Sequence, residues 1–474
     1  MLWLISSLVL LLEVAAVISA GHALFAVRTA KGAIAWILGL LAFPLLAVPL
    51  YWFFGSRRFD THARVMREKF ERFAETIGDI REGLAPYEVE ADQIKPSSAV
   101  TLSSLAQRPF LGGNQLDLLI DGPATFDAIL GEITRAERSI YVQFYIVRED
   151  ALGRRLLEAL AARAACGVEV CFLYDSLGSN GLHEDSLRRW RDRGVQIRPF
   201  CAERDWRDRW RLNFRNHRKN VIVDGRVGFV GGHNVGDEYL GLDPCFGPWR
   251  DTHVRVEGPA ALQLQMSFAS DWLFATGEKV SGPWQPHTPA GAHQTAVVLD
   301  SGPSDEIERC TLFFLHCITA ARHRLWIASP YFVPDEGIIQ ALQLAAVRGV
   351  DVRILLPEKA DHTLVWLASF AMLKELQLPG IAIYRYRPGF LHYKALLVDD
   401  DLAAIGTANF DNRSFRLNFE ITLAVPDRTF ATQTAAMFER DFALSTQVDG
   451  CSYDNLPPYR KIGVKASRLL APIL

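Results

Sequence analysis

The sequence predicts an α/β protein in which two similar αβα domains, related by a pseudo-twofold, follow an N-terminal two-helix transmembrane hairpin. Three observations lead to this prediction. A motif with His, Lys and Asp occurs twice, strands and helices alternate in the same order near each copy, and two long apolar stretches lie within the first 55 residues. We place the hairpin at 1–56, a juxtamembrane helix and linker at 57–107, and the two domains at 108–285 and 290–474.

The two apolar stretches run from residue 2 to about 27 and from residue 32 to about 55. Each is long enough to cross a hydrocarbon core of roughly 30 Å as a helix. We expect Pro44 and Pro49 to kink the second helix, and a charged helix over 61–82 to follow it. Six basic residues lie between 57 and 72, against Arg28 and Lys31 between the stretches. The positive-inside rule therefore puts the two domains in the cytoplasm.

Strands and helices alternate in both halves of the remaining chain. A strand over 139–146, a helix over 153–166 and a strand over 168–173 are expected in the first half. The second half repeats them at 325–328, 336–348 and 350–355, and Gly167 and Gly349 follow the two helices as stop signals. Helices between strands imply parallel connections. The duplication therefore covers whole domains, which meet within the Pro/Gly/His-rich stretch 282–294.

The duplicated motif has the skeleton H-x-K-x-x-x-x-D, and a tail with Gly and Asn follows each copy at the same distance. Its residues are His217, Lys219, Asp224 and Asn234 in the first copy, and His392, Lys394, Asp399 and Asn409 in the second. A lone match arises by chance in roughly one chain in a hundred of this length, so two copies indicate one shared site. The apolar run inside each motif is typical of a strand buried on both faces.

The side chains of each motif are placed by strand geometry. Residues two apart point to the same face of a strand, so each His should lie beside its Lys. The aspartates come at the far end of each strand, where Asp commonly bonds the backbone of a turn. We therefore expect Asp224 and Asp399 to brace turns rather than to touch a substrate.

Two His, two Lys and two Asn at one point suit phosphodiester chemistry. One imidazole can attack phosphorus and the other can protonate the departing alkoxide. Lysine and asparagine donors stabilise the charge on the non-bridging oxygens. Two fixed ammonium groups take the place that Mg²⁺ has in many phosphoryl transfers, and no metal-ligand cluster is evident, so we expect no metal and no cofactor. Isolated core histidines are the alternative, against which the repeat argues.

Each imidazole needs a partner that sets its tautomer. Asp251 follows the first motif and Glu420 follows the second, each in a strand-like segment. Either carboxylate can serve the His of its own half or that of the opposite half, and a surface salt bridge is the alternative for both.

The motifs resemble the HKD signature of the phospholipase D superfamily. The segments 232–239, 249–255, 330–334 and 409–420 narrow the resemblance to membrane-anchored bacterial cardiolipin synthases, over essentially the whole chain. The resemblance implies an inner-membrane enzyme that moves a phosphatidyl group between two phosphatidylglycerol molecules, giving cardiolipin and glycerol. It also implies a phosphohistidine, for which we favour His217, with His392 as acid and base. Phosphatidylethanolamine in place of one phosphatidylglycerol stays open, as does the oligomeric state.

Three other functions are alternatives for a chain with these motifs. Hydrolysis of phospholipids uses the same residues and differs only in whether water reaches the intermediate. A nuclease is disfavoured by the net charge of −3 and by the apolar stretches, since nucleic-acid binding needs a broad basic surface. A non-enzymatic scaffold would not be expected to keep both His and both Lys. The seven scattered cysteines indicate reduced thiols rather than disulfides or a zinc site.

Two further segments have membrane-like composition. Residues 204–215 interleave Arg with aromatic side chains, which fits a membrane interface, single-stranded nucleic acid or a solvated charged face. Residues 459–474 mix basic and apolar side chains and are expected to form an interfacial amphipathic segment.

Overall fold

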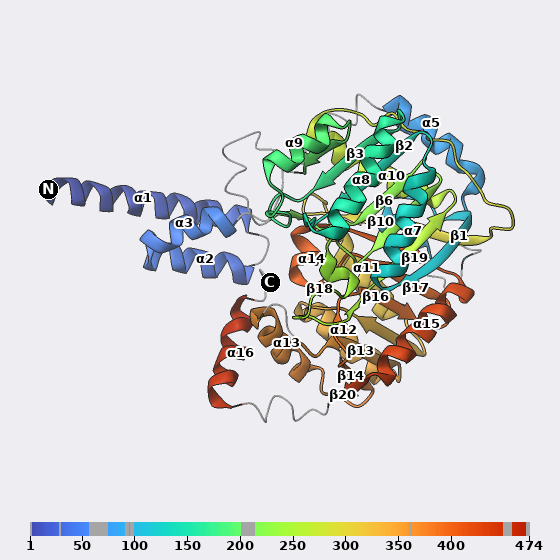
Figure 1. Ribbon diagram of the computed structural model, residues 1–474. Helices are drawn as coiled ribbons and strands as arrows, with labels where there is room; N and C mark the ends of the chain where they lie inside the picture. The colour runs from blue at the N-terminus through green and yellow to red at the C-terminus, as the bar shows by residue number, and fades with distance from the viewer. Residues whose placement is uncertain are drawn as a thin grey trace.

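The centre of the fold is one long mixed sheet to which both halves of the chain contribute (Figure 1). The computed structural model describes residues 2–27, 30–55, 74–90, 94, 99–200, 214–359, 363–448 and 457–470. Within these residues sixteen strands belong to the sheet, and helices cover both of its faces. The predicted α/β class is confirmed.

The strand order is the same in both halves when it is read outward from the middle of the sheet. In the first half it is β1 (Leu111–Ile120), β9 (Thr252–Glu257), β7 (Val227–Gly231), β6 (Asn220–Val223), β2 (Ser139–Phe144), β3 (Glu169–Tyr174) and β4 (Gln196–Pro199). In the second half it is β10 (Gln294–Ser301), β19 (Asn418–Val425), β17 (Leu402–Gly406), β16 (Ala395–Val398), β11 (Arg324–Ala328), β13 (Asp351–Pro357) and β14 (Ile381–Tyr386), with β20 (Ser445–Gln447) at the edge. β1 and β10 pair antiparallel and join the halves.

The predicted crossover units are confirmed. β2, β3 and β4 run parallel, as do β11, β13 and β14. Helices α8 (Ala151–Ala165) and α12 (Glu336–Val347) make the first crossover in each half, and an aspartate side chain caps each helix start. Gly167 and Gly349 both have φ +85°, a left-handed conformation that glycine adopts without strain and that ends a helix.

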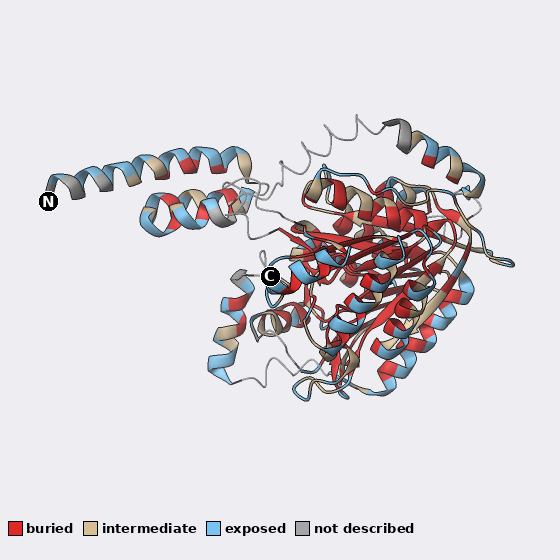
Figure 2. Cartoon of the chain, turned by 45° about the horizontal axis from the view of Figure 1, so that its top comes forward, coloured by how far each residue is buried: buried red, intermediate tan, exposed pale blue. Residues whose placement is uncertain are grey.

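The two motif strands are buried on both faces, as their sequences predict. Val221 and Val223 of β6 face a cluster under α7 (Asp121–Arg135), α8 and α9 (Glu184–Asp192), whereas Ile222 faces the opposite layer. That opposite layer is formed by α10 (Ala260–Thr276) and α15 (Arg428–Ala443), and its apolar cluster runs through both halves. Figure 2 shows this buried sheet between exposed helix surfaces. The motif strands are therefore packed from both sides within the core.

The remaining described elements lie around this core, except for β5, which is the sixteenth strand of the sheet and pairs with β19 beside the main strand order. They are α5 (Ala74–Leu84), η1 (Ala85–Tyr87), α6 (Ala99–Ala106), β5 (Arg215–Asn216), η2 (Asp237–Leu240), β8 (Trp249–Arg250), α11 (Arg309–Ala320), β12 (Phe332–Val333), α13 (Thr363–Glu375), β15 (Phe390–Leu391), β18 (Phe410–Asp411), α14 (Asn412–Arg416) and α16 (Pro458–Leu470). Of the helix expected over 61–82 only the end is described, within α5. Most of the 204–215 segment lies outside the described residues. The expected C-terminal amphipathic segment forms α16, which buries Val464 against α13 and exposes Tyr459 and Ile462.

The N-terminal region departs from the expected two-helix hairpin. The second apolar stretch is two helices, α2 (Ala30–Ala42) and α3 (Pro44–Phe54), which follow α1 (Leu2–Ala26). The break falls at Phe43 because a proline cannot donate a backbone hydrogen bond and disfavours the helical conformation of the residue before it. The returning α3 packs on α1, where Trp52 Nε1 donates to Ser19 Oγ at 3.0 Å. Figure 1 shows α3 folded back beside α1 and α2, and all three helices contact one another.

Only α1, among the described helices, is long and apolar enough to cross a membrane. The surface of the three helices is nonetheless exposed (Figure 2), and large apolar side chains such as Phe25 and Leu45 face outward. A soluble protein rarely exposes so continuous an apolar surface, so this surface is suited to lipid.

Candidate active site

Each motif is carried to the site by a short strand that pairs with the other half of the chain. β5 runs parallel to the start of β19, and β15 runs parallel to β8. The backbone N–H of His217 donates to Phe419 O at 2.9 Å, and that of His392 donates to Arg250 O at 2.8 Å. These crossed pairings bring the two motifs together.

The orienting carboxylates are exchanged between the halves. His217 Nδ1 lies 3.0 Å from Glu420 Oε2, and His392 Nδ1 lies 2.7 Å from Asp251 Oδ2. Both carboxylates are almost fully buried, which rules out the surface salt bridge considered above. An Nδ1–H that donates to a carboxylate leaves Nε2 of the neutral ring with a lone pair.

Further donors hold the Glu420 carboxylate in place. Thr407 Oγ1 donates to Oε2 at 2.6 Å, and Asn418 Nδ2 donates to Oε1 at 3.1 Å. The Asp251 carboxylate accepts the backbone N–H of Thr252 at 2.7 Å through Oδ1. Each imidazole is therefore oriented by a carboxylate that is itself hydrogen-bonded, which fixes the ring direction.

Burial decides the protonation state of the two imidazoles. It lowers the pKa of His217 to about 4, although the Glu420 charge opposes the shift. It lowers the pKa of His392 to about 4 as well, with the Lys394 ammonium acting in the same direction and Asp251 opposing it. Burial alone would raise the pKa of Asp251 and Glu420, but the adjacent histidines and lysines outweigh it and hold both values below the usual range. At pH 7 the carboxylates are ionised and the imidazoles are neutral.

The two motif lysines are both buried, and a charge on one acts on the other. Lys219 Nζ donates to His217 O at 2.7 Å, and Lys394 Nζ lies 3.1 Å from His392 Nε2. Burial, and next the Lys394 charge, hold the pKa of Lys219 well below its usual value. Two ammonium groups that repel each other in a buried site favour binding of an anion between them. Among the described residues no three His, Cys, Asp or Glu side chains are grouped as a metal site would need.

The motif aspartates do not point into this site. Asp224 accepts the backbone N–H groups of residues 137, 138 and 139, and Asp399 accepts those of residues 322, 323 and 324. Both residues have a positive φ, +53° and +51°, a conformation that Asp tolerates better than most side chains. Each therefore ties the end of its motif strand to the start of the neighbouring strand.

The two tail asparagines differ from each other. Both ends of the Asn234 amide are engaged, because Oδ1 accepts from the backbone N–H of Ile146 at 3.1 Å and Nδ2 donates to the Tyr239 hydroxyl at 3.0 Å. Asn409 has a buried Oδ1 that accepts no hydrogen bond from the described residues. The two asparagines are thus held differently, although they follow their motifs at the same distance.

The glycines of the motif tails are required by close packing. A Cβ atom on Gly231 would lie 2.3 Å from Thr252 O, and one on Gly406 would lie 2.3 Å from Ile421 O. A Cβ atom on Gly232 would meet the Asp251 carboxylate itself at 2.1 Å. Only glycine lets these tails pass against the strands that carry the orienting carboxylates.

Several residues of the site have no signal in the sequence. The residue between His and Lys in each motif anchors the strand to the opposite layer: Arg218 Nη1 donates to Asp271 Oδ1 at 2.7 Å, and the Tyr393 hydroxyl donates to Asp441 Oδ2 at 2.8 Å. Aromatic rings pack on the two motif imidazoles as well. These ring neighbours are Tyr145 beside His217, and Trp249, Tyr239 and Phe390 around His392.

Comparison with known proteins places these features in a family. A family model described as "Cardiolipin synthase, PLD-like domain" matches residues 129–272 and 314–442. The chain is 45% identical over 468 residues to cardiolipin synthase A of Pseudomonas putida, covering 98% of this chain and 97% of that one. It is 44% identical over 471 residues to cardiolipin synthase A of Pseudomonas fluorescens, covering 98% of each. The crystal structure of phosphatidylserine synthase from Haemophilus influenzae shares the fold, with a TM-score of 0.62, 15% identity and coverage of 80% of this chain and 100% of that one.

Proposed function

The chain belongs to the cardiolipin synthase family of phospholipase D-like proteins, and we propose that it transfers a phosphatidyl group from one phosphatidylglycerol to another. The products are cardiolipin and glycerol. The observation that carries the proposal is the exchange of carboxylates, in which His217 and His392 are each oriented by the other half of the chain. We also propose that the halves are related by a pseudo-twofold that passes between β1 and β10, in keeping with the repeated strand order.

The first step forms a covalent intermediate. Nε2 of the neutral His217 attacks phosphorus, and the bond from phosphorus to the glycerol oxygen breaks. His392 gives that oxygen a proton from Nε2. Because the pKa of His392 is about 4 without lipid, His392 takes this proton from solvent when the lipid binds, since the negative phosphodiester raises the pKa of the imidazole that it approaches.

The second step releases cardiolipin. A glycerol hydroxyl of the second phosphatidylglycerol attacks phosphorus, His392 takes its proton, and the bond between phosphorus and His217 breaks. Lys219 and Lys394 hold the non-bridging oxygens, and the negative charge between them relieves their mutual repulsion. Asp251 and Glu420 stabilise each imidazole while it is positively charged.

The helices at the N-terminus suggest how the enzyme meets its lipid. We propose that it is held in the bacterial inner membrane by α1, with α2 and α3 as a re-entrant pair. Because α3 returns to the end of α1 where α2 begins, the chain leaves the bundle at that end. In the sequence, basic residues at 28, 31 and 57–72 flank the helix ends that meet there, so the positive-inside rule assigns this end of the bundle to the cytoplasm.

Topology can be tested with tags on the two ends of the chain. Protease added outside intact spheroplasts should remove an N-terminal tag and spare a C-terminal one. Removal of the C-terminal tag under these conditions would place the catalytic domains outside the cytoplasm and end the proposal.

The activity is tested by lipid mass spectrometry. Membranes that contain the protein are incubated with labelled phosphatidylglycerol, beside a His217→Ala control. Cardiolipin with free glycerol, absent from the control, is the expected result. Phosphatidic acid alone would mean hydrolysis in place of transfer, and no lipid product at all would reject a lipid substrate.

A further inference from the structure

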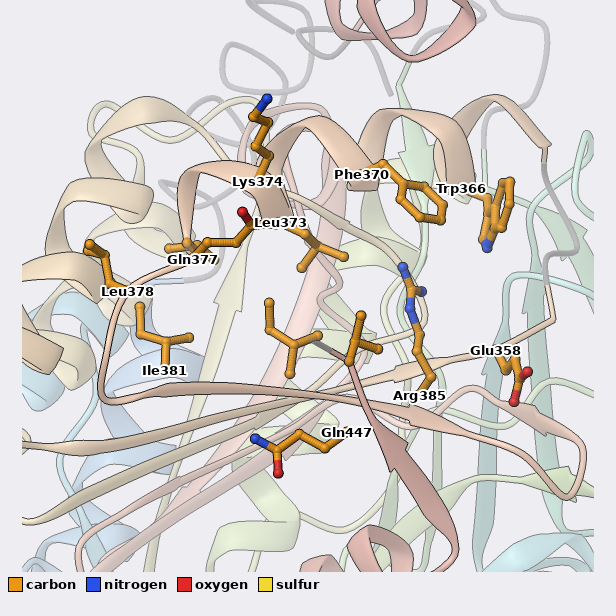
Figure 3. A pocket seen from close by; sticks show the side chains of 13 residues that line it. Glu358, Trp366, Phe370, Leu373, Lys374, Gln377, Leu378, Ile381, Arg385 and Gln447 are labelled. Carbon is orange, nitrogen blue, oxygen red and sulfur yellow. The ribbon is translucent and has the colours of Figure 1, made fainter. Parts of the chain in front are cut away.

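A cavity of about 480 Å³ lies between α13 and the strands β14 and β20 (Figure 3). This volume falls within the range of about 300–1,000 Å³ that is common for small-molecule sites. The cavity is separated from the motif strand β16 by β13 and β11, so it is not part of the catalytic site. Its walls are mainly apolar, and the apolar side chains include Phe370, Leu373, Leu376, Leu378, Ile381 and Ile383.

Arg385 is half-buried in this apolar cavity, with one end of its guanidinium group fully covered. Arg385 reaches from β14 toward α13 (Figure 3), and its guanidinium carbon lies 5.4 Å from the centre of the Phe370 ring. Nη1 donates to Pro357 O at 3.0 Å, whereas Nη2 is buried and meets no hydrogen-bond acceptor among the described residues. Burial lowers the pKa of Arg385 to about 10, with only partial compensation by the Glu358 charge, so the side chain remains charged at pH 7. A buried charged donor without an acceptor is costly, and an anionic ligand would satisfy it.

The cavity has neighbours on two sides, toward the catalytic site and toward the N-terminal helices. A smaller cavity shares Trp366 and Arg385 with the first and reaches Phe332. Phe332 of β12 pairs with Phe410 of β18, and Phe410 directly follows Asn409 in the sequence. On the outer side, α13 packs against the basic helix α16, and both lie on the side of the molecule where the N-terminal helices lie (Figures 1 and 2).

We propose that this cavity is a second lipid site, distinct from the catalytic one, which takes an amphiphile with a phosphate or carboxylate head and a hydrocarbon chain. Arg385 Nη2 binds the anionic head where the two cavities meet. The hydrocarbon chain of the ligand lies among the leucines and isoleucines of the larger cavity, where burial of its methylene groups contributes to affinity. The site does not require turnover, so it goes beyond the proposed transferase activity.

Trp366 supplies a reporter, because it lines both cavities. The full-length protein carries His217→Ala so that no lipid is consumed, and is studied in detergent micelles. Lipids brominated on the acyl chain quench tryptophan at short range, and the difference between Trp366 and Trp366→Phe versions isolates this residue from the other tryptophans. The probes are brominated phosphatidylglycerol, a brominated fatty acid and brominated phosphatidylcholine as the zwitterionic control.

We expect both anionic probes, or one of them, to quench Trp366 more strongly than the phosphatidylcholine does. Arg385→Gln should weaken the binding affinity for the anionic probe by about tenfold. Arg387→Gln changes an exposed arginine two residues away and should leave this affinity unchanged. Leu373→Phe fills the cavity and leaves Arg385 in place, so it should also prevent quenching and serves if Arg385→Gln fails to fold. Which anionic probe responds assigns the head as phosphate or carboxylate.

Two results would overturn the site. One is the absence of Trp366-dependent quenching by any probe. The other is equal quenching by charged and zwitterionic lipids that Arg385→Gln does not change. Since binding is read in an inactive background, either result is independent of whether the active enzyme makes cardiolipin.

Discussion

The exchanged carboxylates make a sharp prediction for Glu420→Gln. In the native site both carboxylate oxygens are acceptors, for His217 Nδ1, for Thr407 Oγ1 and for Asn418 Nδ2. An amide puts a donor at one of these two positions. It therefore permits the tautomer of His217 that carries hydrogen on Nε2, where the lone pair is needed for attack. It also removes the negative charge that stabilises the phosphorylated imidazole.

The expected loss follows from these two effects. A hydrogen bond to a charged group contributes about 1.5–3 kcal/mol, and the wrong imidazole tautomer lowers kcat by about 10⁴-fold in the Ser-His-Asp hydrolases. We therefore expect Glu420→Gln to lower kcat by about 10²–10⁴-fold, or about 3–5.5 kcal/mol. The fold should survive, because the amide is as large as the carboxylate and does not carry a buried charge.

The assay uses two substrates that differ in the leaving group. Phosphatidylglycerol needs a proton on its departing alkoxide, whereas phosphatidyl-p-nitrophenol releases a stable phenolate without one. If His217 is the nucleophile, Glu420→Gln loses activity on both substrates. The matched variant Asp251→Asn, which disturbs His392, should lose turnover of phosphatidylglycerol but keep the initial burst of nitrophenolate.

Two outcomes would refute this reasoning. If Glu420→Gln keeps the burst and Asp251→Asn loses it, His392 is the nucleophile and the assigned roles are reversed. If both variants stay within about threefold of the native protein on both substrates, the exchanged carboxylates have no part in the chemistry. Thermal unfolding of each variant, followed by circular dichroism, separates a loss of chemistry from a loss of fold.

Three further predictions concern pH, the motif aspartates and metal. Because the pKa values of His217 and His392 are about 4 in the folded protein and near 6.5 when unfolded, stability against denaturant should be constant above pH 6.5 and fall between 6.5 and 4. On the nitrophenyl substrate kcat/KM should fall as the pH is lowered, with a midpoint near pH 4 where His217 becomes protonated. A midpoint near pH 6.5 would contradict a buried, neutral His217. Asp224→Asn and Asp399→Asn should each lower the free energy of unfolding by about 1–3 kcal/mol while kcat changes by less than about threefold, so a large loss of kcat without destabilisation would give these residues a chemical role. Turnover should be unchanged by EDTA, and activity that vanished with EDTA and returned with Mg²⁺ would contradict charge stabilisation by the two lysines.

The N-terminal helices show where sequence reasoning stopped. Hydropathy and length identified both apolar stretches. They do not predict which way the backbone turns where a proline interrupts a helix. Pro44 was expected to kink one long helix. In the structure it begins a new one, because α3 gains contacts with α1 through Trp52 and Ser19.

The motif asparagines show a second limit. The repeat suggests equal roles for Asn234 and Asn409, since both follow the motif at the same distance. Tyr239 and the backbone of Ile146 engage one amide, and no such partners reach the Oδ1 of the other. Position in a repeat is a property of the chain, whereas hydrogen-bond partners belong to the fold.

The sequence by itself determined the α/β class, the duplication, the buried motif strands and the chemical groups of the site. These depend on local pattern, since strand alternation, helix stop signals and motif spacing are all read over a few residues. Only the tertiary structure decided which carboxylate orients which histidine. The partners are 203 residues apart for His217 and Glu420, and 141 apart for His392 and Asp251, and they meet because short strands of each half pair with the other half. No local pattern specifies such pairing, because it follows from how two packed domains share one sheet.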